Sequence, residues 1–401
     1  MVKKVVMIVC ILSLFTVSGC WDLREVNANS ISTGVGVESQ GDDKITFSAQ
    51  LVRPLPPGET SSGQMESVVA TTNDYGVALA ARRLSLSLAQ VPEWSHVRTL
   101  ILGEKLVDRD VTLVVDFMTR NRHLRPDTNL MIASQVSPEE LLSSKLPNVT
   151  DLGSGLQDLL RLNEKELGIY VPTTMGEFTY KLMTPGIEPV VPQITLEKAK
   201  GNETPEKAGD KNSGNTNNKK SRIILNGTAV FKGKKMVGTL NENESRGYRW
   251  LNATSKAGGL FNTASPLNPN NYITLEIIQF SSKTRADFSQ NRLKMIVEIN
   301  ADLGFYQQDS DNALLTLERK SQLQEAANLE IKRQIAACIK KSQELNSDVL
   351  GWGRIIQEYE PDQWKELAAV WPEQFPLIES EIKVESNIKR SMLANESFRF
   401  Q

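Results

Sequence analysis

The sequence predicts a multi-domain protein that combines α/β and α+β architecture. Three observations support this prediction. Between residues 31 and 183, short apolar runs typical of strands alternate with helical patterns, as in a mixed sheet covered by helices. Residues 199–221 contain no Val, Ile, Leu, Met or aromatic side chain, which is typical of a disordered linker. After this segment, strand patterns surround one long helical pattern, which indicates an antiparallel-rich sheet with a long helix.

The first nineteen residues predict an export signal peptide. Lys3 and Lys4 precede an apolar run from Val5 to Val17. Thirteen helical residues reach only about 20 Å, less than a bilayer core of roughly 30 Å. The run ends in Val17-Ser18-Gly19-Cys20, which resembles the bacterial lipoprotein box. We therefore expect cleavage before Cys20 and an S-diacylglycerol group on its sulfur, with or without N-acylation. The alternative is an ordinary signal peptide with a chance cysteine.

Residues 20–198 are predicted to form an N-terminal α/β domain. Strands are expected where apolar positions alternate or form short runs, at 31–37, 44–52, 97–102 and 129–133. Helices are expected over 77–88 and 111–118, with two or three more between 138 and about 183. Gly34-Val35-Gly36 lacks the third glycine of a dinucleotide-binding motif and lies in a strand pattern, so we interpret it as sheet. This order of elements predicts right-handed crossovers and a partly parallel sheet.

Residues 222–401 are predicted to form an α+β region, either as one unit or as two subdomains divided near 270–290. A hairpin is expected from two runs that flank Lys232-Gly233-Lys234. The other expected elements are a helix near 242–251, strands at 272–280 and 292–303, a long helix over about 312–345, helices after Gly351-Trp352-Gly353 and at 361–370, and a last strand with Ile378, Ile382, Val384 and Ile388 on one face.

Charge and cysteine usage limit the classes of partner. Of 46 basic side chains, Lys3 and Lys4 leave with the signal, so 44 oppose 48 acidic ones. This balance does not favour a nucleic-acid partner or a polybasic membrane patch. No later segment is apolar enough to span a bilayer, so lipid on Cys20 would be the anchor. Cys10 leaves with the signal and Cys20 is modified, so only Cys338 remains and an intrachain disulfide is impossible. Cys338 is predicted to be a buried filler in a helix.

No motif in the sequence indicates catalysis, a cofactor or a metal. The two histidines, His96 and His123, cannot form a HExxH site, and there is no Cys-x-x-Cys pair, phosphate loop or G-x-S-x-G elbow. The segment from Asp309 to Asn312 begins like a calcium loop, but Leu314 and Lys320 occupy two required positions. We interpret it as a helix N-terminus, where acidic side chains are favoured. We therefore expect a protein that is not an enzyme.

Two clusters of side chains each have two interpretations. The first is either the solvated end of a helix or a docking surface for an acidic partner or lipid headgroup, and contains Arg120, Arg122, His123 and Arg125. The second is either the edge of a core or an anchor patch for a partner, and contains Arg246, Tyr248, Arg249 and Trp250.

Cys20-Trp21-Asp22, followed by Arg24-Glu25, resembles the start of the Ger(x)C family, the lipoprotein C subunits of nutrient germinant receptors in spore-forming bacteria. Further motifs in the family's order lie at 81–85, 100–104, 116–125, 227–232, 236–238, 244–251, 348–353, 364–365 and 371–375. The sequence departs from the family at Trp352, where another aromatic residue is common, and in the length of the segment at 199–221.

The resemblance implies a lipid-anchored, non-catalytic subunit that assembles with integral-membrane A and B subunits on the outer face of the inner spore membrane. It implies a role in germination in response to nutrients and a fold of three domains, with no catalytic residues to transfer to this chain. A solute-binding lipoprotein that captures a small nutrient is the alternative, because clefts between domains favour ligand sites. An envelope hydrolase is a third hypothesis that no motif supports.

Overall fold

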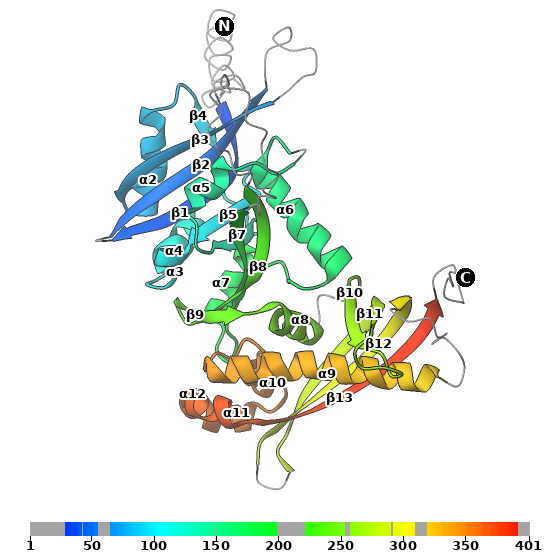
Figure 1. Ribbon diagram of the computed structural model, residues 1–401. Helices are drawn as coiled ribbons and strands as arrows, with labels where there is room; N and C mark the ends of the chain where they lie inside the picture. The colour runs from blue at the N-terminus through cyan, green and yellow to red at the C-terminus, as the bar shows by residue number, and fades with distance from the viewer. Residues whose placement is uncertain are drawn as a thin grey trace, which may run out of the picture.

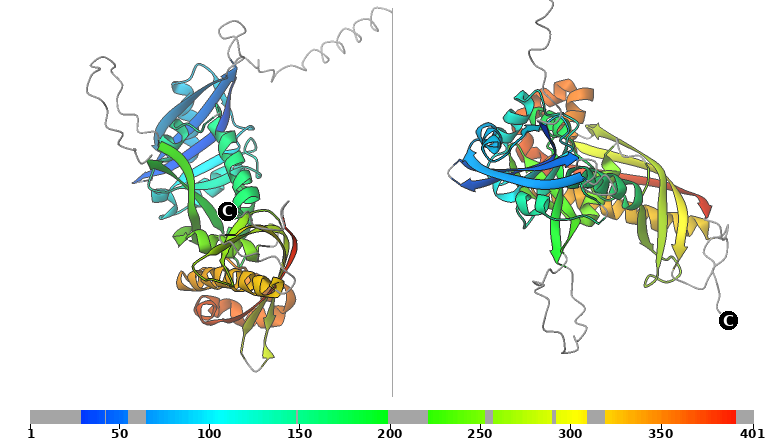
Figure 2. Two further views of the ribbon diagram at one scale, coloured as in Figure 1. Left: turned by 45° about the vertical axis from the view of Figure 1, so that its right-hand side comes forward. Right: turned by 90° about the horizontal axis from the view of Figure 1, so that it is seen from above.

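The chain folds around two β-sheets. The computed structural model describes residues 29–41, 43–54, 65–147, 149–198, 221–252, 257–289, 292–308 and 319–391. Figures 1 and 2 show the first sheet with its helices above the second sheet, and the long helix α9 running across the second sheet. This arrangement confirms the predicted mixed fold with a multi-element N-terminal half and a sheet with a long helix in the C-terminal half.

The first sheet has the strand order β3-β2-β1-β5-β6-β7-β8-β9, with β4 paired to the start of β1. Strands β1, β5, β6 and β7 are parallel to their neighbours in this series, while β2, β3, β8 and β9 pair antiparallel. The predicted partly parallel sheet is therefore confirmed. The strands are β1 (Asn29–Gly41), β2 (Lys44–Pro54), β3 (Met65–Tyr75), β4 (Val91–Glu93), β5 (Thr99–Gly103), β6 (Asn129–Ala133), β7 (Val190–Lys198), β8 (Ser221–Lys232) and β9 (Lys235–Leu240).

Helices cover both faces of this sheet, because its central strands are apolar on both sides. One core packs beneath α2 (Val77–Arg83) with the turn η3 (Leu84–Leu86), α3 (Glu104–Val107), α4 (Thr112–Arg120) and α7 (Met175–Met183). The other packs beneath α5 (Pro138–Ser143) and α6 (Leu152–Leu162), which continues as η4 (Asn163–Leu167). Gly34 and Gly36 lie in β1, as predicted. Glycine suits both positions because an added Cβ would lie only 2.9 Å from Leu142 at Gly34 and 2.7 Å from Pro138 at Gly36.

The predicted hairpin is present, but it belongs to the first sheet. Strand β8 pairs antiparallel with β7, from Val190 opposite Val230 to Lys198 opposite Ser221. Ala229 and Phe231 of β8 are buried in the first core. The sequence grouped this hairpin with residues 222–401, and β7 itself was not predicted. Pro192 lies at a register shift in β7, where a missing N–H is tolerated.

The second sheet has the order β10-β11-β12-β13, with β13 parallel to β12 and the other pairs antiparallel. Its strands are β10 (Leu260–Ala264), β11 (Tyr272–Asp287), β12 (Lys294–Gln308) and β13 (Glu379–Ser391). The predicted alternation of β12 is confirmed, since Met295, Val297, Ile299, Ala301 and Leu303 are all buried. Their face packs against α9 (Lys320–Glu344), whose apolar residues at spacing four are buried as expected.

Between α9 and β13 the chain forms short helices around an aromatic cluster. They are α10 (Trp352–Tyr359), α11 (Pro361–Leu367), η6 (Ala368–Val370), α12 (Trp371–Gln374) and η7 (Phe375–Leu377). Trp364 and Trp371 pack edge to face with ring centroids 5.2 Å apart. Trp352 packs on Phe375 at 5.7 Å. These contacts hold the helices beside the second sheet.

Several predictions concern residues outside the described ranges. These are the signal peptide, Cys20 and the Trp21-to-Glu25 motif, the linker up to Lys220, and the segment from Asp309 to Asn312. Across the described ranges, no helix has the length and apolar character that a bilayer crossing requires.

Candidate functional site

Helix α8 (Glu242–Leu251) lies at the junction between the two sheets and is the centre of the candidate site. It contacts β8 and β9 on one side and β11 and α9 on the other. The cluster that the sequence singled out is buried there, with exposed fractions of 7% for Arg246, 5% for Tyr248 and 0% for both Arg249 and Trp250. The interpretation as part of a core is confirmed. The interpretation as a surface anchor for a partner is wrong, because other elements cover these side chains.

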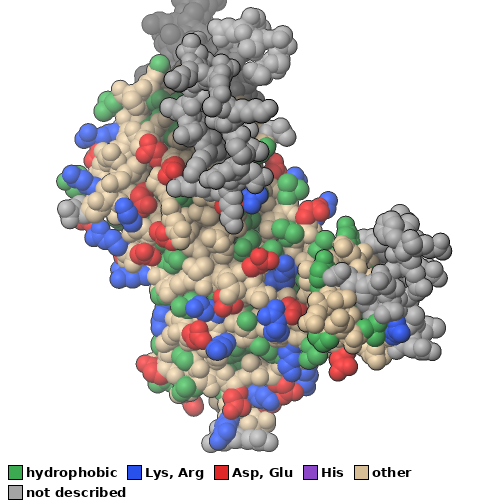
Figure 3. All heavy atoms as spheres, in the orientation of Figure 1, with side chains coloured by type: hydrophobic (Ala, Val, Ile, Leu, Met, Phe, Trp, Pro, Cys, Tyr) green, Lys and Arg blue, Asp and Glu red, His purple; other side chains and the backbone are tan. Residues whose placement is uncertain are grey.

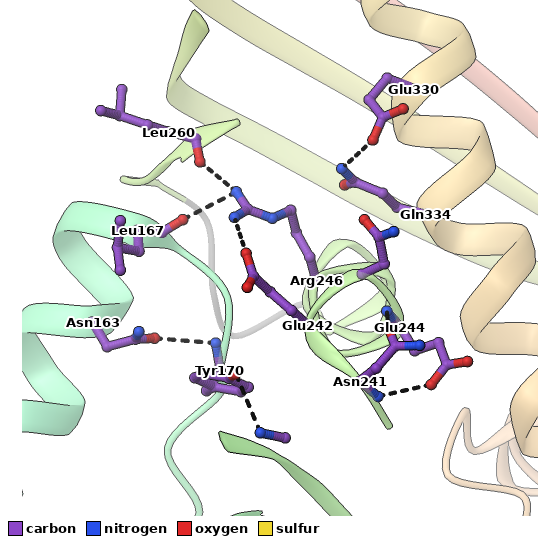
Figure 4. Close-up of polar contacts among 12 residues, drawn as sticks. Asn163, Leu167, Tyr170, Asn241, Glu242, Glu244, Arg246, Leu260, Glu330 and Gln334 are labelled. Atoms are coloured by element: carbon purple, nitrogen blue, oxygen red, sulfur yellow. Dashed lines mark hydrogen bonds and ion pairs between the residues drawn. The ribbon is translucent and has the colours of Figure 1, made fainter. Parts of the chain in front are cut away.

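A reciprocal capping box starts α8 directly after β9. The side chain of Asn241 accepts a hydrogen bond from the backbone N–H of Glu244 at 3.0 Å, and the Glu244 carboxylate accepts one from the N–H of Asn241 at 2.8 Å (Figure 4). Both side chains satisfy donors that a helix start otherwise leaves without partners. The local sequence therefore sets where α8 begins and which face it turns to each sheet.

Arg246 links a helix of the first half to the first strand of the second sheet. Its guanidinium donates to the carbonyl of Leu167 in η4 at 3.1 Å and to the carbonyl of Leu260 in β10, and pairs with Glu242 at 3.7 Å (Figure 4). Burial lowers the pKa of Arg246, and the nearby Glu242 opposes that change. One buried side chain thus bridges segments that are far apart in the sequence.

Arg249 makes a second bridge one turn later. Its Nη2 donates to the carbonyls of Ala257 and Gly258 at 2.7 and 2.8 Å, and its guanidinium lies 5.4 Å from the centre of the Phe280 ring. Burial lowers the pKa of Arg249 to about 10, so the group stays charged at neutral pH. A charged planar donor that is fully covered acts here as a structural tie.

Trp250 connects α8 to α9. Its indole N–H donates to Gln334 Oε1 at 2.9 Å. Gln334 Nε2 donates in turn to Glu330 Oε1 at 2.7 Å (Figure 4). The Trp250 ring packs on Phe280 with centroids 4.7 Å apart. Its aromatic surface therefore fills the second core, while its one polar atom has a partner.

The turn after α9 forms the other part of the junction, around the buried carboxylate of Asp348. This carboxylate accepts hydrogen bonds from the N–H groups of Trp352 and Gly353 at 3.0 and 2.8 Å, and from the Trp371 indole at 3.1 Å. The Asp348 carbonyl accepts from the N–H of Glu188, just before β7, at 2.9 Å. The sequence marked residues 348–353 as a motif without indicating the role of Asp348. An acidic residue directly before the apolar Val349 and Leu350 could have indicated a buried carboxylate.

The pH dependence of stability should report on Asp348. Burial raises its pKa from 3.8 to about 7, against hydrogen bonds donated by Gly353, Trp352, Trp371 and Gly351, which lower it. Between these values the folded state binds more protons than the unfolded chain, so this contribution to stability is present below pH 4 and is lost as pH rises through 7. We expect the stability of the wild type relative to Asp348→Asn to fall between pH 4.5 and 7.5, measured by urea unfolding at each pH. A difference that does not change with pH would contradict this assignment.

A second prediction concerns Gly353, where the two halves approach closely. The N–H of Arg354 donates to the carbonyl of Gly186 at 2.8 Å, and a Cβ on Gly353 would lie 2.7 Å from both Gly186 Cα and a ring carbon of Trp364. Gly353→Ala should therefore lower the free energy of unfolding by about 1–3 kcal/mol, as overpacking does. Gly304→Ala in β12 is the control for a simple glycine effect, because the atom nearest to its added Cβ is the far end of the flexible Glu276 side chain, at 3.0 Å. Equal losses measured by urea unfolding would contradict close packing at Gly353.

The other residues that the sequence singled out do not join this site. His96 and His123 are exposed. Arg120 ends α4 and pairs with Asp116 at 2.7 Å, and Arg125 pairs with Asp127 at 3.6 Å, which fits the solvated end of a helix. Cys338 is fully buried in α9, as predicted for a filler, and burial raises the pKa of its thiol to about 12.

Surface features of the described residues include mixed charges and a hollow over the second sheet. No group of three potential metal ligands occurs among these residues. Figure 3 shows acidic and basic side chains interspersed over the second half. A hollow of about 440 Å³ lies over the second sheet and is lined by residues of β11, β12 and β13 such as Gln279, Asn300 and Glu385. The junction can position the two halves relative to each other through buried side chains of α8 and of the turn at Asp348.

Comparisons with known proteins agree with this fold. The family described as "Spore germination protein N-terminal domain" matches residues 22–196, and that described as "Spore germination B3/ GerAC like, C-terminal" matches residues 226–392. Spore germination protein KC of Bacillus subtilis (strain 168) is 23% identical over 422 residues, covering 100% of this chain and 99% of that protein. Spore germination protein B3 of the same organism is 23% identical over 393 residues, covering 94% of each chain.

A solved structure has the same architecture. The crystal structure of the GerBC protein superposes with a TM-score of 0.56 at 17% sequence identity, covering 92% of this chain and 99% of that chain. The two family matches together extend from β1 to β13 and include α8 and the turn at Asp348. The chain therefore belongs to the Ger(x)C family of spore germination proteins.

Proposed function

We propose that this protein is a lipid-anchored, non-catalytic subunit of a spore nutrient germinant receptor. The observation that carries the proposal is the likeness to spore germination proteins KC and B3 along almost the whole chain. The lipoprotein-box sequence ends at Cys20, and the family match starts two residues later. In this proposal, integral-membrane A and B subunits are the partners, and the protein lies on the outer face of the inner spore membrane.

Packing at the junction supports a scaffold role. Buried Arg246 donates to the carbonyl of Leu167, and the carbonyl of buried Asp348 accepts from the N–H of Glu188, so both residues join the two halves. This is the arrangement expected for holding two surfaces in a set orientation. The alternative of a solute-binding lipoprotein requires a cleft between the halves. Among the described residues, buried side chains of α8 lie at that place, and the hollow over the second sheet is lined by β11, β12 and β13 of that sheet alone. The junction therefore does not favour that alternative.

The anchor is tested by Cys20→Ala in a sporulating strain that also carries the A and B subunits. We expect germination close to that of a strain without this protein, because stable anchoring needs two or more acyl chains and the variant has none. Cys10→Ala is the matched control, since this cysteine lies in the signal peptide and should leave with it. Wild-type germination by a Cys20→Ala protein found away from the membrane would contradict the proposal.

Assembly is tested separately by purification of the tagged protein from spore membranes. The A and B subunits should copurify with the tagged protein and form cross-links to residues on its surface. Their absence, with the protein itself recovered in the membrane fraction, would argue against a receptor complex and leave the lipid anchor unaffected.

A further inference from the structure

The described part of the chain starts at one edge of the first sheet. Asn29 and Ile31 of β1 pair in parallel with Val91 and Glu93 of β4. Ser30 Oγ donates to the side chain of Gln90 at 3.3 Å, so the segment before β4 lies beside the start of β1. The turn η3 lies against both β3 and β4. Three elements therefore gather around the point where the chain enters the fold.

Each of these elements presents an apolar side chain to solvent. Leu86 of η3 is 83% exposed, the highest value among the large apolar side chains described, and Val68 of β3 and Val91 of β4 are 50% and 47% exposed. Val68 lies opposite Leu51, which pairs with Ser32 near the start of β1. Arg82, exposed in the last turn of α2, adds a positive charge nearby. We call Val68, Leu86, Val91 and Arg82 the tether edge.

Exposed apolar side chains are common on soluble proteins, so exposure alone assigns no partner. The length of chain before the tether edge supplies the second argument. Asn29 lies nine residues after Cys20, a segment that reaches at most roughly 30 Å when extended. Figure 1 places β4 at one end of the molecule, and α11 and α12 at the opposite end. A lipid on Cys20 would hold the tether edge close to the bilayer.

We propose that the tether edge is the membrane-facing surface of this protein and that a phospholipid bilayer covers it. The inference rests on the proposed lipid anchor. Tethering raises the local concentration of lipid around this edge, so a small apolar contact suffices to orient the molecule. Leu86 enters the interfacial region, while Arg82 extends its charged group toward anionic headgroups. The second sheet and its helices then point away from the membrane.

The experiment uses the full lipidated protein in vesicles of phosphatidylcholine and phosphatidylglycerol. Cys20 is blocked by its lipid and Cys338 is buried, so a single introduced cysteine can be labelled with an environment-sensitive fluorophore. Leu86→Cys is compared with Leu377→Cys, a leucine in η7 with a similar exposed fraction of 76% at the other end of the molecule. Lipids that carry a quencher below the headgroup report which label enters the bilayer.

We expect the label at 86 to be quenched at least about two-fold more than the label at 377, as for a side chain in the interfacial region. Equal quenching, or stronger quenching at 377, would overturn the membrane-facing assignment. Mass spectrometry of the N-terminal peptide and flotation with vesicles distinguish a wrong membrane-facing assignment from a failure of the lipid anchor. If Cys20 carries no lipid and the protein does not float, the proposed anchor and this inference both fall; if it floats without quenching at 86, only this inference falls.

Discussion

Asp348→Ala is expected to lower the free energy of unfolding by about 3–5 kcal/mol. The Asp348 side chain is 4% exposed and accepts three hydrogen bonds, from the N–H groups of Trp352 and Gly353 and from the Trp371 indole. Alanine leaves all three donors buried without this acceptor, and each such loss costs about 1–3 kcal/mol. The effect should be large because the three donors come from α10 and α12, which both depend on this turn.

Urea unfolding followed by tryptophan fluorescence measures the loss, since Trp352 and Trp371 donate to Asp348 directly. Asp362→Ala is the matched control. Its side chain is 90% exposed and pairs with Lys365 at 2.8 Å, so its removal should cost less than about 1 kcal/mol. If the two variants unfold at the same urea concentration, the Asp348 carboxylate does not hold the turn as described.

Arg249→Met is expected to cost about 2–4 kcal/mol. Methionine keeps an unbranched apolar stem but removes the donors to the carbonyls of Ala257 and Gly258. It also removes the cation that lies over the Phe280 ring. Burial is the largest influence on the pKa of Arg249 and lowers it; Glu164 raises it, and Arg246 lowers it by a smaller amount. The variant therefore also loses the attraction to Glu164, and relief of the repulsion with Arg246 offsets only part of the loss.

The control for this variant is Arg161→Met, in the last turn of α6. Its side chain is 77% exposed and pairs with Asp158 at 3.1 Å, so the expected loss is below about 1 kcal/mol. Thermal unfolding of the purified protein compares the two. Unfolding of Arg249→Met at the temperature found for Arg161→Met would show that the buried guanidinium contributes little to the junction.

Periodic apolar patterns predicted the helices and strands that have one apolar, buried face and one polar, exposed face. The residues Leu323, Ala327, Ile331, Ile335 and Ile339 marked one face of α9, and all are buried. Strand β3 was missed because Thr71, Asn73 and Asp74 make its second half polar, and only pairing with β2 orders it as the last strand of the sheet. Strand β7 was missed because Pro192 interrupts it, although neighbours on both sides complete its pairing.

In the candidate site, too, the role of a side chain depends on distant partners that the local sequence does not reveal. Arg246, Arg249 and Trp250 stood out in the sequence, but charge and aromaticity alone do not distinguish a buried tie from a surface anchor. The decisive partners are distant: Leu167 lies 79 residues from Arg246, and Gln334 lies 84 residues from Trp250. Asp348 likewise acquires its role from Trp371, which is 23 residues away.

By itself the sequence determined the helical and strand faces, the burial of Cys338, the absence of known catalytic motifs and the likeness to a germination family. It also supplied the expectation of a lipid on Cys20. Only the tertiary structure decided that the hairpin β8–β9 extends the first sheet, that two arginines of α8 are buried, and that exposed leucine and valine side chains lie where the chain enters the fold. The physical reason is that local patterns specify which face of an element is apolar, whereas strand pairing and burial depend on which distant segments meet it.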